Sequence, residues 1–588
     1  MVKPQVNTLF EISWEVCNKV GGIYSVITSK AEYMQEAYNS YHAIGPYQNQ
    51  KKDEFIPQPI PTSWEEAIER LQKEGIVVHY GTWNTKSNPN VILLEYTGIQ
   101  DKVDTLKADL WDYYGVDTLN SGGDVNNPIL LSYAASRFLQ ELKKDNCVGH
   151  KTVLHAHEWL TGFTTLFIDQ WNVPIHTVFT THATMLGRTI SGKEGNLYET
   201  LQSINPDEKA HQLGVQDKHT AERAAAQTAN VFTTVSDVTR KECEALLGRN
   251  PDVLVLNGID VRHFPHFEEA SVRHREHNKK INEFLSYTFY PHYTFDTDKN
   301  LTYLFAGRYE YENKGLDILL ESLKDLDKEL QGTDKTVTAL LCIAMPNNGP
   351  KYSLLQQKIG YQHIQDQLQT HGDNLLDNIL FDLLTNKNKT ERELMQSDEF
   401  RSLHKSLTRF KKENTSPVLC THRVNEDNKV IRKMKELGLT NKEGNNVKVL
   451  LCPAYLDGND GLLNLSYFEM ISASDLGIYP SYYEPWGYTP IETASMGVPT
   501  VTTDLAGFGK YIEKESETVP GEGGIHVVPR YKKTHEDVVK ALTNTLLTYT
   551  KKTEKERVKE KIRAKELSER PDWEQFKDNY IEAHNLSL

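Results

Sequence analysis

"DLGIYPSYYEPWGYTPIETASMGVPTVTT", residues 475–503, contains the pattern that decides the fold. The apolar runs 475–481 and 497–503 are typical of buried strands, and residues 487–496 form a loop that enters a helix. Buried strands separated by a helix predict a parallel sheet that is covered on both faces. Two glutamates, Glu484 and Glu492, stand on either side of the loop. One carboxylate therefore precedes the turn, and the other lies within the helix.

Working outward from this unit, similar apolar runs form two series, with helical patterns between them. They predict two doubly wound domains of an α/β protein that face each other across a cleft, with ligands at the carboxyl ends of the strands. We expect domains at residues 1–260 and 261–550, a helical insertion at about 352–435, and C-terminal helices at 551–588 that pack back on the N-terminal domain. The predicted strands are 8–13, 90–96, 152–159, 176–182 and 231–236 in the first series, and 301–308, 337–345, 446–454, 475–481 and 497–503 in the second.

Composition excludes several classes of protein. The 588 residues carry 66 Lys and Arg against 81 Asp and Glu, a net charge of −15, which argues against a general nucleic-acid-binding protein. No apolar run reaches the length of a membrane span. The six cysteines are scattered and form no CxxC pair, so free thiols in a reducing compartment are expected and a cytoplasmic location is favoured.

Several polar residues follow predicted strands. Gly21 and Gly22 precede a helix, where free backbone N–H groups suit a phosphate, although most such turns are only turns. Arg308 and Lys314 follow another strand and suit a diphosphate, or form a solvated loop. The histidines of "HAHEW" (155–159) have no third metal ligand at a familiar spacing, so a histidine that orients or binds a sugar is favoured over a metal site.

These motifs together resemble, in order along the chain, those of the eukaryotic-type glycogen synthases, which are retaining glycosyltransferases of the GT-B fold. The matching stretches are "FEISWEVCNKVGGIYSV", "HAHEWLTG", "FTTHATMLGR", "ERAAAQTANVFTTVS", "AGRYEYENKG" and "PSYYEPWGYTPIETASMGVPTVTT". The resemblance covers residues from about 8 to about 575. It implies transfer of glucose from UDP-glucose to the non-reducing 4-OH of an α-1,4-glucan, without a cofactor or a metal.

The resemblance also implies roles for particular residues. Glu484 would stabilise the oxocarbenium-like sugar, Glu492 would bind the ribose, and Tyr467 would stack on the uracil. The other implied residues act through cations, backbone N–H groups or polar side chains that line the donor. They are Arg308 and Lys314 at the diphosphate, Gly487, Tyr488 and Thr489 with the neighbouring Trp486 at the phosphate or sugar, His157, Asn257 and Arg188 at the glucose, and Lys19, Gly21 and Gly22 from the N-terminal domain.

Regulation is less well defined by the sequence. The family carries an arginine cluster that binds glucose 6-phosphate, and here the corresponding stretch holds Arg557, Lys561, Arg563 and Lys565 among glutamates. Arg557 and Lys561 stand one helical turn apart and could grip a phosphate, or belong to a solvated helix. We expect no long regulatory tails. The insertion lies where the family forms oligomer contacts, so a tetramer is favoured.

Three rival interpretations stay open. The first is another GT-B transferase that uses ADP-glucose or a small acceptor, as in sucrose or trehalose synthesis. The second is a phosphorylase, which is disfavoured because no pyridoxal phosphate lysine motif is present. The third is a catalytically silent scaffold that binds glucan. The scaffold is disfavoured because the chain keeps Glu484, Glu492, Arg308, Lys314 and His157.

Overall fold

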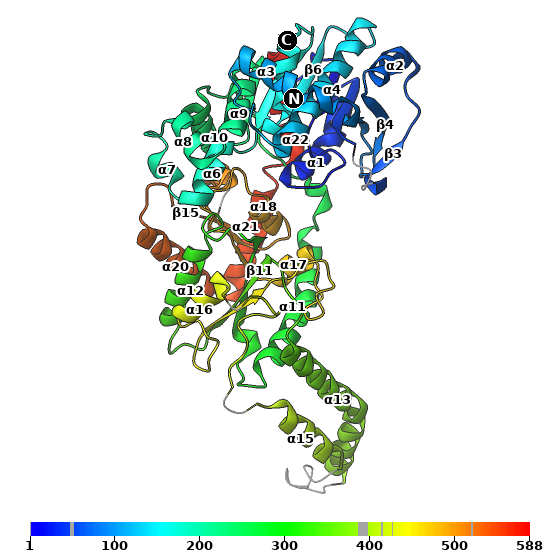
Figure 1. Cartoon of the computed structure of the whole chain (residues 1–588). Coiled ribbons are helices and arrows are strands. Elements are labelled where there is room, and N and C mark those ends of the chain that lie inside the picture. The colour runs from blue at the N-terminus through cyan, green and yellow to red at the C-terminus, as the bar shows by residue number, and fades with distance from the viewer. Residues whose placement is uncertain (1, 48–51, 386–397, 413–414, 426, 519–520) are drawn as a thin grey trace.

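The computed structural model of the chain describes residues 2–47, 52–385, 398–412, 415–425, 427–518 and 521–588 (Figure 1). Its upper part is built on a nine-stranded sheet in the order β3-β4-β5-β2-β1-β6-β7-β8-β9. The strands from β5 to β9 in this order pair in parallel, whereas β3 and β4 form an antiparallel edge beyond β5. The strands are β1 (Thr8–Ile12), β2 (Ser40–Pro46), β3 (Phe55–Pro57), β4 (Val77–Trp83), β5 (Asn90–Glu95), β6 (Thr152–His157), β7 (His176–Thr181), β8 (Val231–Thr234) and β9 (Val253–Leu254).

The lower part is built on a six-stranded, fully parallel sheet in the order β12-β11-β10-β13-β14-β15. Numbered within the domain, this is the order 3-2-1-4-5-6 of a doubly wound sheet, whose ligand crevice lies where the winding reverses. That point falls between β10 and β13, the two strands that precede the candidate site residues. The strands are β10 (Asn300–Arg308), β11 (Thr336–Ala344), β12 (Val447–Cys452), β13 (Leu476–Ile478), β14 (Thr500–Thr503) and β15 (Ile525–Val528).

Helices cover both sheets and explain why the strands are apolar on both faces. In β6 and β12 every residue is buried, as a strand enclosed on two sides requires. In the upper domain the helices are α1 (Gly22–Ala37), α2 (Glu65–Lys73), α3 (Val103–Tyr114), α4 (Gly123–Lys144), α5 (Trp159–Gln170), α6 (Met185–Glu194), α7 (Leu197–Thr200), α8 (Pro206–Leu213), α9 (Gln216–Thr228) and α10 (Asp237–Glu242). In the lower domain they are α11 (Phe267–Phe289), α12 (Leu316–Glu329), α13 (Tyr352–Leu384), α15 (Asp398–Phe410), α16 (Lys429–Glu436), α17 (Tyr467–Ala473), α18 (Tyr488–Ser495), α19 (Gly507–Glu515) and α20 (His535–Lys551).

The ten strands predicted from apolar runs are confirmed, and so is the helix after the Gly-Tyr-Thr-Pro loop, α18. Strands β2, β3, β4, β9 and β15 were not predicted. Strand β3 has only three residues and ends in a proline, β4 mixes half-buried polar and apolar residues, and β9 has only two residues, so none of them forms a clear apolar run. The segment 261–300 contains the long helix α11.

The last two helices, α21 (Glu554–Ser568) and α22 (Trp573–Leu586), pack on different domains. Helix α21 lies against α18 and β15 of the lower domain, whereas α22 crosses to α1, β8 and β9 of the upper one. One apolar cluster joins α22 to both domains, because Trp573 and Phe576 are buried together with Val255 and Trp486. The C-terminal segment therefore ties the two sheets together, and Figure 1 shows the C-terminus beside the N-terminal domain.

The predicted insertion at 352–435 is helical in α13, α15 and α16, whereas residues 415–425 contain no helix. Helices α13 and α15 extend away from the body (Figure 1). Residues 386–397, 413–414 and 426 of this prediction lie outside the described residues. Leu354 and Ile364 are buried, but Ile359 and Leu368, which share the same helical pattern, are exposed. None of the helices in the described part of the chain combines the length and apolar character that crossing a bilayer requires.

Candidate active site

The core of the candidate site is an ion pair between two loops at the crevice of the lower sheet. Lys314 follows β10, Glu484 follows β13, and the Lys314 ammonium donates to the Glu484 carboxylate. The backbone N–H groups of Tyr482 and Tyr483 donate to the Asn313 carbonyl at 2.8 and 3.2 Å, which holds the two loops together. Both side chains of the pair are only partly buried, at 15% and 23% exposure, so a ligand can reach them.

Arg308 adds a second cation at the same edge of the sheet. It is the last residue of β10, its side chain is 75% exposed, and one guanidinium nitrogen lies 3.2 Å from the Glu310 carboxylate. Exposed ion pairs of this kind contribute little to stability, so the side chain can leave Glu310 for a stronger anion at small cost.

Helix α18 directs its N-terminus toward the ion pair. Gly487, its N-cap, has φ of 109°, and a Cβ at this position would lie 3.1 Å from the Cγ of Glu484. The turn therefore packs directly against the side chain of Glu484. The free N–H groups at this helix start carry the partial positive charge that attracts a phosphate.

Tyr467 and Glu492 lie next to each other, as their proposed roles at one nucleoside require. Tyr467 begins α17, Glu492 lies within α18, and the tyrosine hydroxyl donates to the Glu492 carboxylate at 2.6 Å. Burial raises the pKa of the Glu492 carboxyl, and the bond from Tyr467 opposes that rise.

The side chain of Trp486 is placed differently from the binding role that the resemblance implied for this residue, whereas Tyr488 was expected to contribute only its backbone N–H group. The Trp486 ring is buried against Phe508, Tyr511 and Phe576, so this side chain packs the junction between the domains. The Tyr488 hydroxyl donates to the Gly258 carbonyl at 3.3 Å. Only the backbone N–H groups of these two residues are therefore candidates for contact with a ligand. The large rings are buried instead, because burial of their apolar surface is strongly favourable.

The glycine turn of the upper domain is already capped by the chain itself. The backbone N–H groups of Gly21 and Tyr24 each donate to the Glu15 carboxylate at 2.8 Å. An anion therefore already occupies the N-terminus of α1, where a phosphate was expected. Gly22 is exposed, and Lys19 lies over the Tyr24 ring with its ammonium 5.5 Å from the ring centroid.

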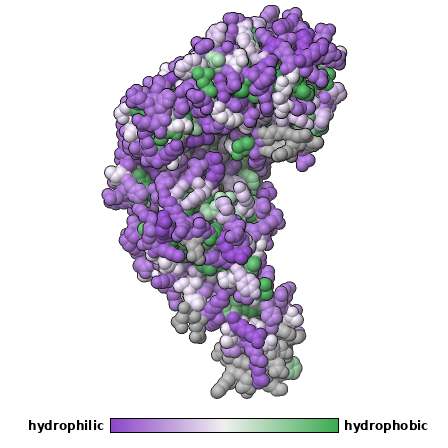
Figure 2. All heavy atoms as spheres, viewed as in Figure 1, coloured by the Kyte–Doolittle hydropathy of each residue, from purple (hydrophilic) through white to green (hydrophobic). Residues whose placement is uncertain are grey.

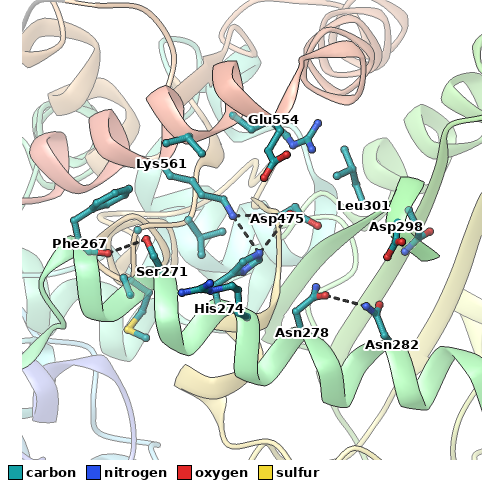
Figure 3. A pocket seen from close by; sticks show the side chains of 18 of the residues that line it. Phe267, Ser271, His274, Asn278, Asn282, Asp298, Leu301, Asp475, Glu554 and Lys561 are labelled. Atoms are coloured by element: carbon teal, nitrogen blue, oxygen red, sulfur yellow. Dashed lines mark hydrogen bonds and ion pairs between the residues drawn. The ribbon is translucent and has the colours of Figure 1, made fainter. Parts of the chain in front are cut away.

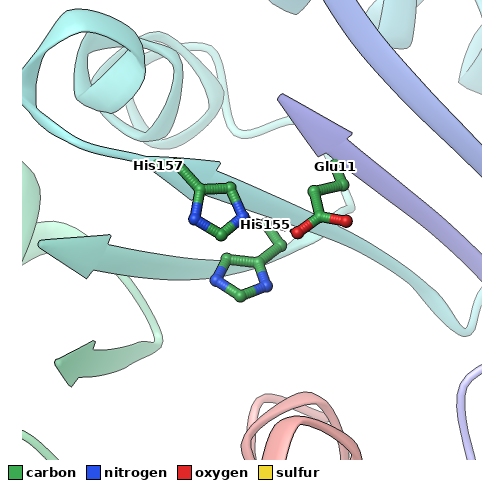
Figure 4. Close-up of side chains that lie close together, drawn as sticks. All are labelled: Glu11, His155 and His157. Atoms are coloured by element: carbon green, nitrogen blue, oxygen red, sulfur yellow. Dashed lines mark hydrogen bonds and ion pairs between the residues drawn. The ribbon is translucent and has the colours of Figure 1, made fainter. Parts of the chain in front are cut away.

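A buried polar cluster stands behind the carboxyl edge of the upper sheet. Figure 4 shows Glu11 of β1 beside His155 and His157 of β6, with ligand-type atoms within 4.8 Å of one another. The His157 Nε2 lies 2.6 Å from the Glu11 carboxylate, and its Nδ1 lies 2.9 Å from Nε2 of His182. Lys30 also donates to Glu11 and balances its charge. All these groups have partners, which favours a hydrogen-bonded network over a metal site.

His157 consequently does not reach the cleft by itself. Both its ring nitrogens are occupied and its side chain is fully buried, whereas His182 follows the carboxyl end of β7. Sequence reasoning favoured His157 for contact with the sugar, although "TTHATMLGR" also contained His182. The other upper-domain candidates are the exposed Arg188 on α6 and Asn257, whose buried side-chain oxygen has no partner among the described residues.

The two domains also meet beside the ion pair. The hydroxyls of Tyr198, Thr184 and Tyr483 donate to the Glu242 carboxylate at 3.0, 2.8 and 3.2 Å. Burial raises the pKa of Glu242 to about 7. Because Tyr483 immediately precedes Glu484, this contact links the upper domain to the loop that carries the candidate catalytic carboxylate.

A second site is a cavity of about 610 Å³ between α11 and α21 (Figure 3). Lys561 lies 3.2 Å from Nε2 of His274, and the Nδ1 of that histidine donates to the Ser472 carbonyl at 2.7 Å. Arg557 and Arg275 line the same cavity. His274 and Arg275 were not predicted from the sequence, although residues 261–300 are rich in His and Arg.

The remaining charges of α21 face elsewhere. Arg563 donates to the carbonyls of Gly523 and Ser516, and Lys565 donates to that of Ser495. Glu560 accepts from the Gly524 N–H and pairs with His526 and Lys552. Of the predicted basic cluster, only Arg557 and Lys561 therefore lie at the cavity, which Glu554, Asp298 and Asp475 also line. The Asp475 carboxylate lies 4.0 Å from the Lys561 ammonium and 3.8 Å from Nε2 of His274.

Two doubly wound sheets, with polar loops at the crevice of the second, form the GT-B fold. The catalytic domain of starch synthase IV from Arabidopsis thaliana, solved with ADP and acarbose, has this fold, with a TM-score of 0.52 at 14% identity over 99% of both chains.

The family model for glycogen synthase matches residues 11–588, and the chain belongs to this family. It is 34% identical to glycogen [starch] synthase isoform 2 of Saccharomyces cerevisiae, over 99% of this chain and 86% of the relative. It is 32% identical to the human liver glycogen [starch] synthase, over 99% of this chain and 83% of the relative. The predicted fold class, family and enzyme class are thus confirmed.

Proposed function

We propose that the enzyme transfers glucose from UDP-glucose to the non-reducing 4-OH of an α-1,4-glucan with retention of configuration. The observation that carries the proposal is the Lys314–Glu484 ion pair, which lies at the crevice of the lower sheet beside the N-cap of α18. Cations and a helix N-terminus suit a diphosphate, and a carboxylate beside them suits a sugar that becomes positively charged.

In the proposed complex the nucleotide lies along the lower domain. Tyr467 stacks on the uracil, Glu492 binds the ribose hydroxyls, and Lys314 with Arg308 holds the diphosphate. The bond between Tyr467 and Glu492 supports this assignment, because it places the stacking ring and the ribose-binding carboxylate side by side. Backbone N–H groups of residues 487–489 complete the phosphate site.

In the proposed reaction the bond between the glucose C1 and the UDP oxygen breaks as the acceptor O4 bonds to C1 on the same face. The acceptor proton passes to the departing phosphate oxygen, and UDP leaves. Arg308 and Lys314 stabilise the charge that grows on that phosphate. Glu484 orients the sugar and stabilises its oxocarbenium character, and no enzyme nucleophile is required.

The upper domain supplies the groups that close over the sugar. We assign the direct contact to His182, with Arg188 and Asn257, and a supporting role to His157. The unpartnered side-chain oxygen of Asn257 supports this placement, because a buried polar atom without a partner is costly until a ligand satisfies it. Closure of the domains then excludes water from the site.

Glucose transfer from UDP-glucose to glycogen tests the reaction. Glu484→Gln keeps the shape of the side chain and removes its charge, so we expect kcat to fall by about a hundredfold or more, as expected when a charged group that stabilises a transition state is lost. UDP binding should change little. Wild-type enzyme that transfers glucose only from ADP-glucose or only to small sugars would favour the rival transferases. Glucan binding without transfer from either donor would favour the scaffold.

We further propose that the cavity between α11 and α21 binds glucose 6-phosphate as an activator. Arg557 and Lys561 are the predicted cations, and His274 adds a neutral ring that can become charged beside a phosphate. Burial and the neighbouring Lys561 lower the pKa of His274 and Asp475 opposes this, so a phosphate bound between Lys561 and His274 would further stabilise the protonated ring.

Activation by glucose 6-phosphate tests this site. Arg557→Ala should raise the activating concentration at least tenfold, since it removes a charge-assisted bond to the phosphate. Lys559→Ala is the matched control, because Lys559 is exposed on the same helix and does not line the cavity. An equal response of both variants would exclude the cavity as the activating site.

The assembly is proposed to be a tetramer formed through α13 and α15. Ile359, Leu376 and Phe381 of α13 are between 59% and 66% exposed, and such apolar surface on a projecting helix favours burial against other copies. Light scattering on Ile359→Glu should detect smaller particles than the wild type.

All six cysteines are free, which supports the proposed cytoplasmic location.

A further inference from the structure

We propose that Glu11, Lys30 and His157 are positioning residues, which fix His182 in the tautomer whose bare Nδ1 accepts a hydrogen bond from a hydroxyl of the donor sugar. The proposal rests on the proposed function for the contact between His182 and the sugar. Lys30 on α1 and Glu11 on β1 are both fully buried and pair with each other, and burial of two charges is costly unless they are paired.

The direction of each hydrogen bond follows from Glu11. Its carboxylate is ionised, because the bonds from Lys30 and His157 hold its pKa far below the usual range. An ionised carboxylate only accepts, so the His157 Nε2 at 2.6 Å must carry a proton. A neutral His157 then has a bare Nδ1, which accepts from the Nε2–H of His182 at 2.9 Å. The remaining nitrogen of His182, Nδ1, is left without a proton.

Burial is the largest cause that lowers the pKa of His157, and Lys30 adds to it, so both favour a neutral His157. A buried glutamate beside a histidine would normally make the histidine an imidazolium ion. Here the Lys30 ammonium already pairs with Glu11, and burial together with Lys30 lowers the pKa of both His157 and His182. Without Lys30, His157 would take up a proton, donate from Nδ1 to His182, and move the proton of His182 to its own Nδ1. The acceptor offered to the sugar would become a donor.

The surroundings of the two imidazoles contain no further acid that bonds to either ring among the described residues. Glu158 accepts only the backbone N–H of His182, at 3.0 Å. Arg188 lowers the pKa of His182, which favours the neutral ring. The ionisable groups that face the pair from all packed elements are Glu11 on β1, Lys30 on α1, Tyr41 on β2, His155 on β6, Glu158 after β6, Arg188 on α6 and His584 on α22.

Three variants test the relay through the pH profile of kcat/KM for UDP-glucose. Lys30→Met should move the acid limb from well below pH 6.5 toward neutral pH and lower kcat/KM at pH 7 at least tenfold. Lys30→Met with Glu11→Gln restores neutrality, since the glutamine oxygen can accept from His157 while its amide donates to Tyr41. This double variant should recover most of the lost activity and the wild-type profile. The control is Tyr303→Phe, at a fully buried tyrosine of the lower domain whose hydroxyl bonds to Thr550 and Leu546, and it should leave the profile unchanged.

If Lys30 and Glu11 only support packing, the double variant should be no more active than Lys30→Met. That result, or an acid limb that stays in place in Lys30→Met, would overturn the proposal. If Lys30→Met does not fold, His157→Gln and His157→Leu replace it. Glutamine can donate to Glu11 and accept from His182, so it should retain at least ten times the kcat/KM of the leucine variant, and equal losses would contradict the relay.

The tautomer can also be observed directly. In the enzyme labelled with 15N-histidine, the signals of His182 are assigned by their absence in His182→Gln. We expect an unprotonated Nδ1 in the wild type and in the double variant, and a protonated Nδ1 in Lys30→Met. A protonated Nδ1 in the wild type would refute the proposed tautomer. UDP binding is measured by calorimetry on each variant. Variants that bind UDP like the wild type have lost only the His182 tautomer, whereas a wild type that does not bind UDP would contradict the proposed donor site itself.

Discussion

The Glu15 side chain occupies the glycine turn at the N-terminus of α1, where a phosphate was expected. Its carboxylate accepts the N–H groups of Gly21 and Tyr24, and a β-carbon on Gly21 would lie 2.9 Å from the Glu15 Oε1. If the turn engages the donor diphosphate, the carboxylate must give way to it. We expect Glu15→Gln to lower the KM for UDP-glucose several-fold with kcat nearly unchanged, in steady-state kinetics. A higher KM would mean that Glu15 instead holds the turn in its binding conformation.

Glu242 makes the junction between the domains sensitive to pH. Burial raises its pKa from 4.5 to about 7, so the folded protein binds a proton more tightly than the unfolded chain. Its contribution to stability is therefore greatest below about pH 4.5 and is lost as pH rises through about 7. Glu242→Gln should raise the free energy of unfolding at pH 8 by up to ~3 kcal/mol, with the gain vanishing at pH 4.5. Thermal unfolding across this range measures it, and a gain independent of pH would assign the effect to packing.

At the scale of elements, the turn into α18 requires glycine. At φ of 109° Gly487→Ala strains the backbone, and its β-carbon would press on Glu484. Gly438→Ala is the matched control, since Gly438 has φ of 77° and a β-carbon there meets no atom within 4 Å. Both variants should lose about 1–2 kcal/mol of stability, but only Gly487→Ala should also lose kcat, by about tenfold or more. Equal kinetics in the two variants would show that the contact with Glu484 is irrelevant to the reaction.

At the scale of the whole molecule, a buried hydrogen-bond network connects α22 to the upper domain. Tyr38 bonds to His584 at 2.6 Å, and His584 bonds to His155 at 3.0 Å. His584→Phe leaves the Tyr38 hydroxyl and the His155 Nδ1 buried without this partner, although His155 Nε2 keeps its bond to Thr180, so the free energy of unfolding should fall by about 2–5 kcal/mol. Adding Tyr38→Phe removes one orphaned group and should recover part of that loss. Glu582→Gln is the control, because Glu582 is exposed on the same helix, and it should not change the free energy of unfolding. If the double variant loses as much stability as the two single variants together, Tyr38 and His584 are not coupled.

The sequence by itself determined the two series of strands, the glycine turns, and the cations and carboxylates that follow β10 and β13. Apolar runs and turn residues are local signals, so they can be recognised without knowing the fold. The polar positions after each strand then follow from the rule that parallel strands end at one edge.

Only the tertiary structure decided which of these side chains face a ligand. Trp486 is buried by Phe576, ninety residues later, and His157 stands behind His182 because Glu11 and Lys30 occupy the space around it. Glu15 turns back onto Gly21, and His274 meets Lys561 from a helix far away in sequence. Such contacts depend on the packing of distant segments, which one sequence does not encode in any local pattern. The residue types were therefore predictable, but their partners were not.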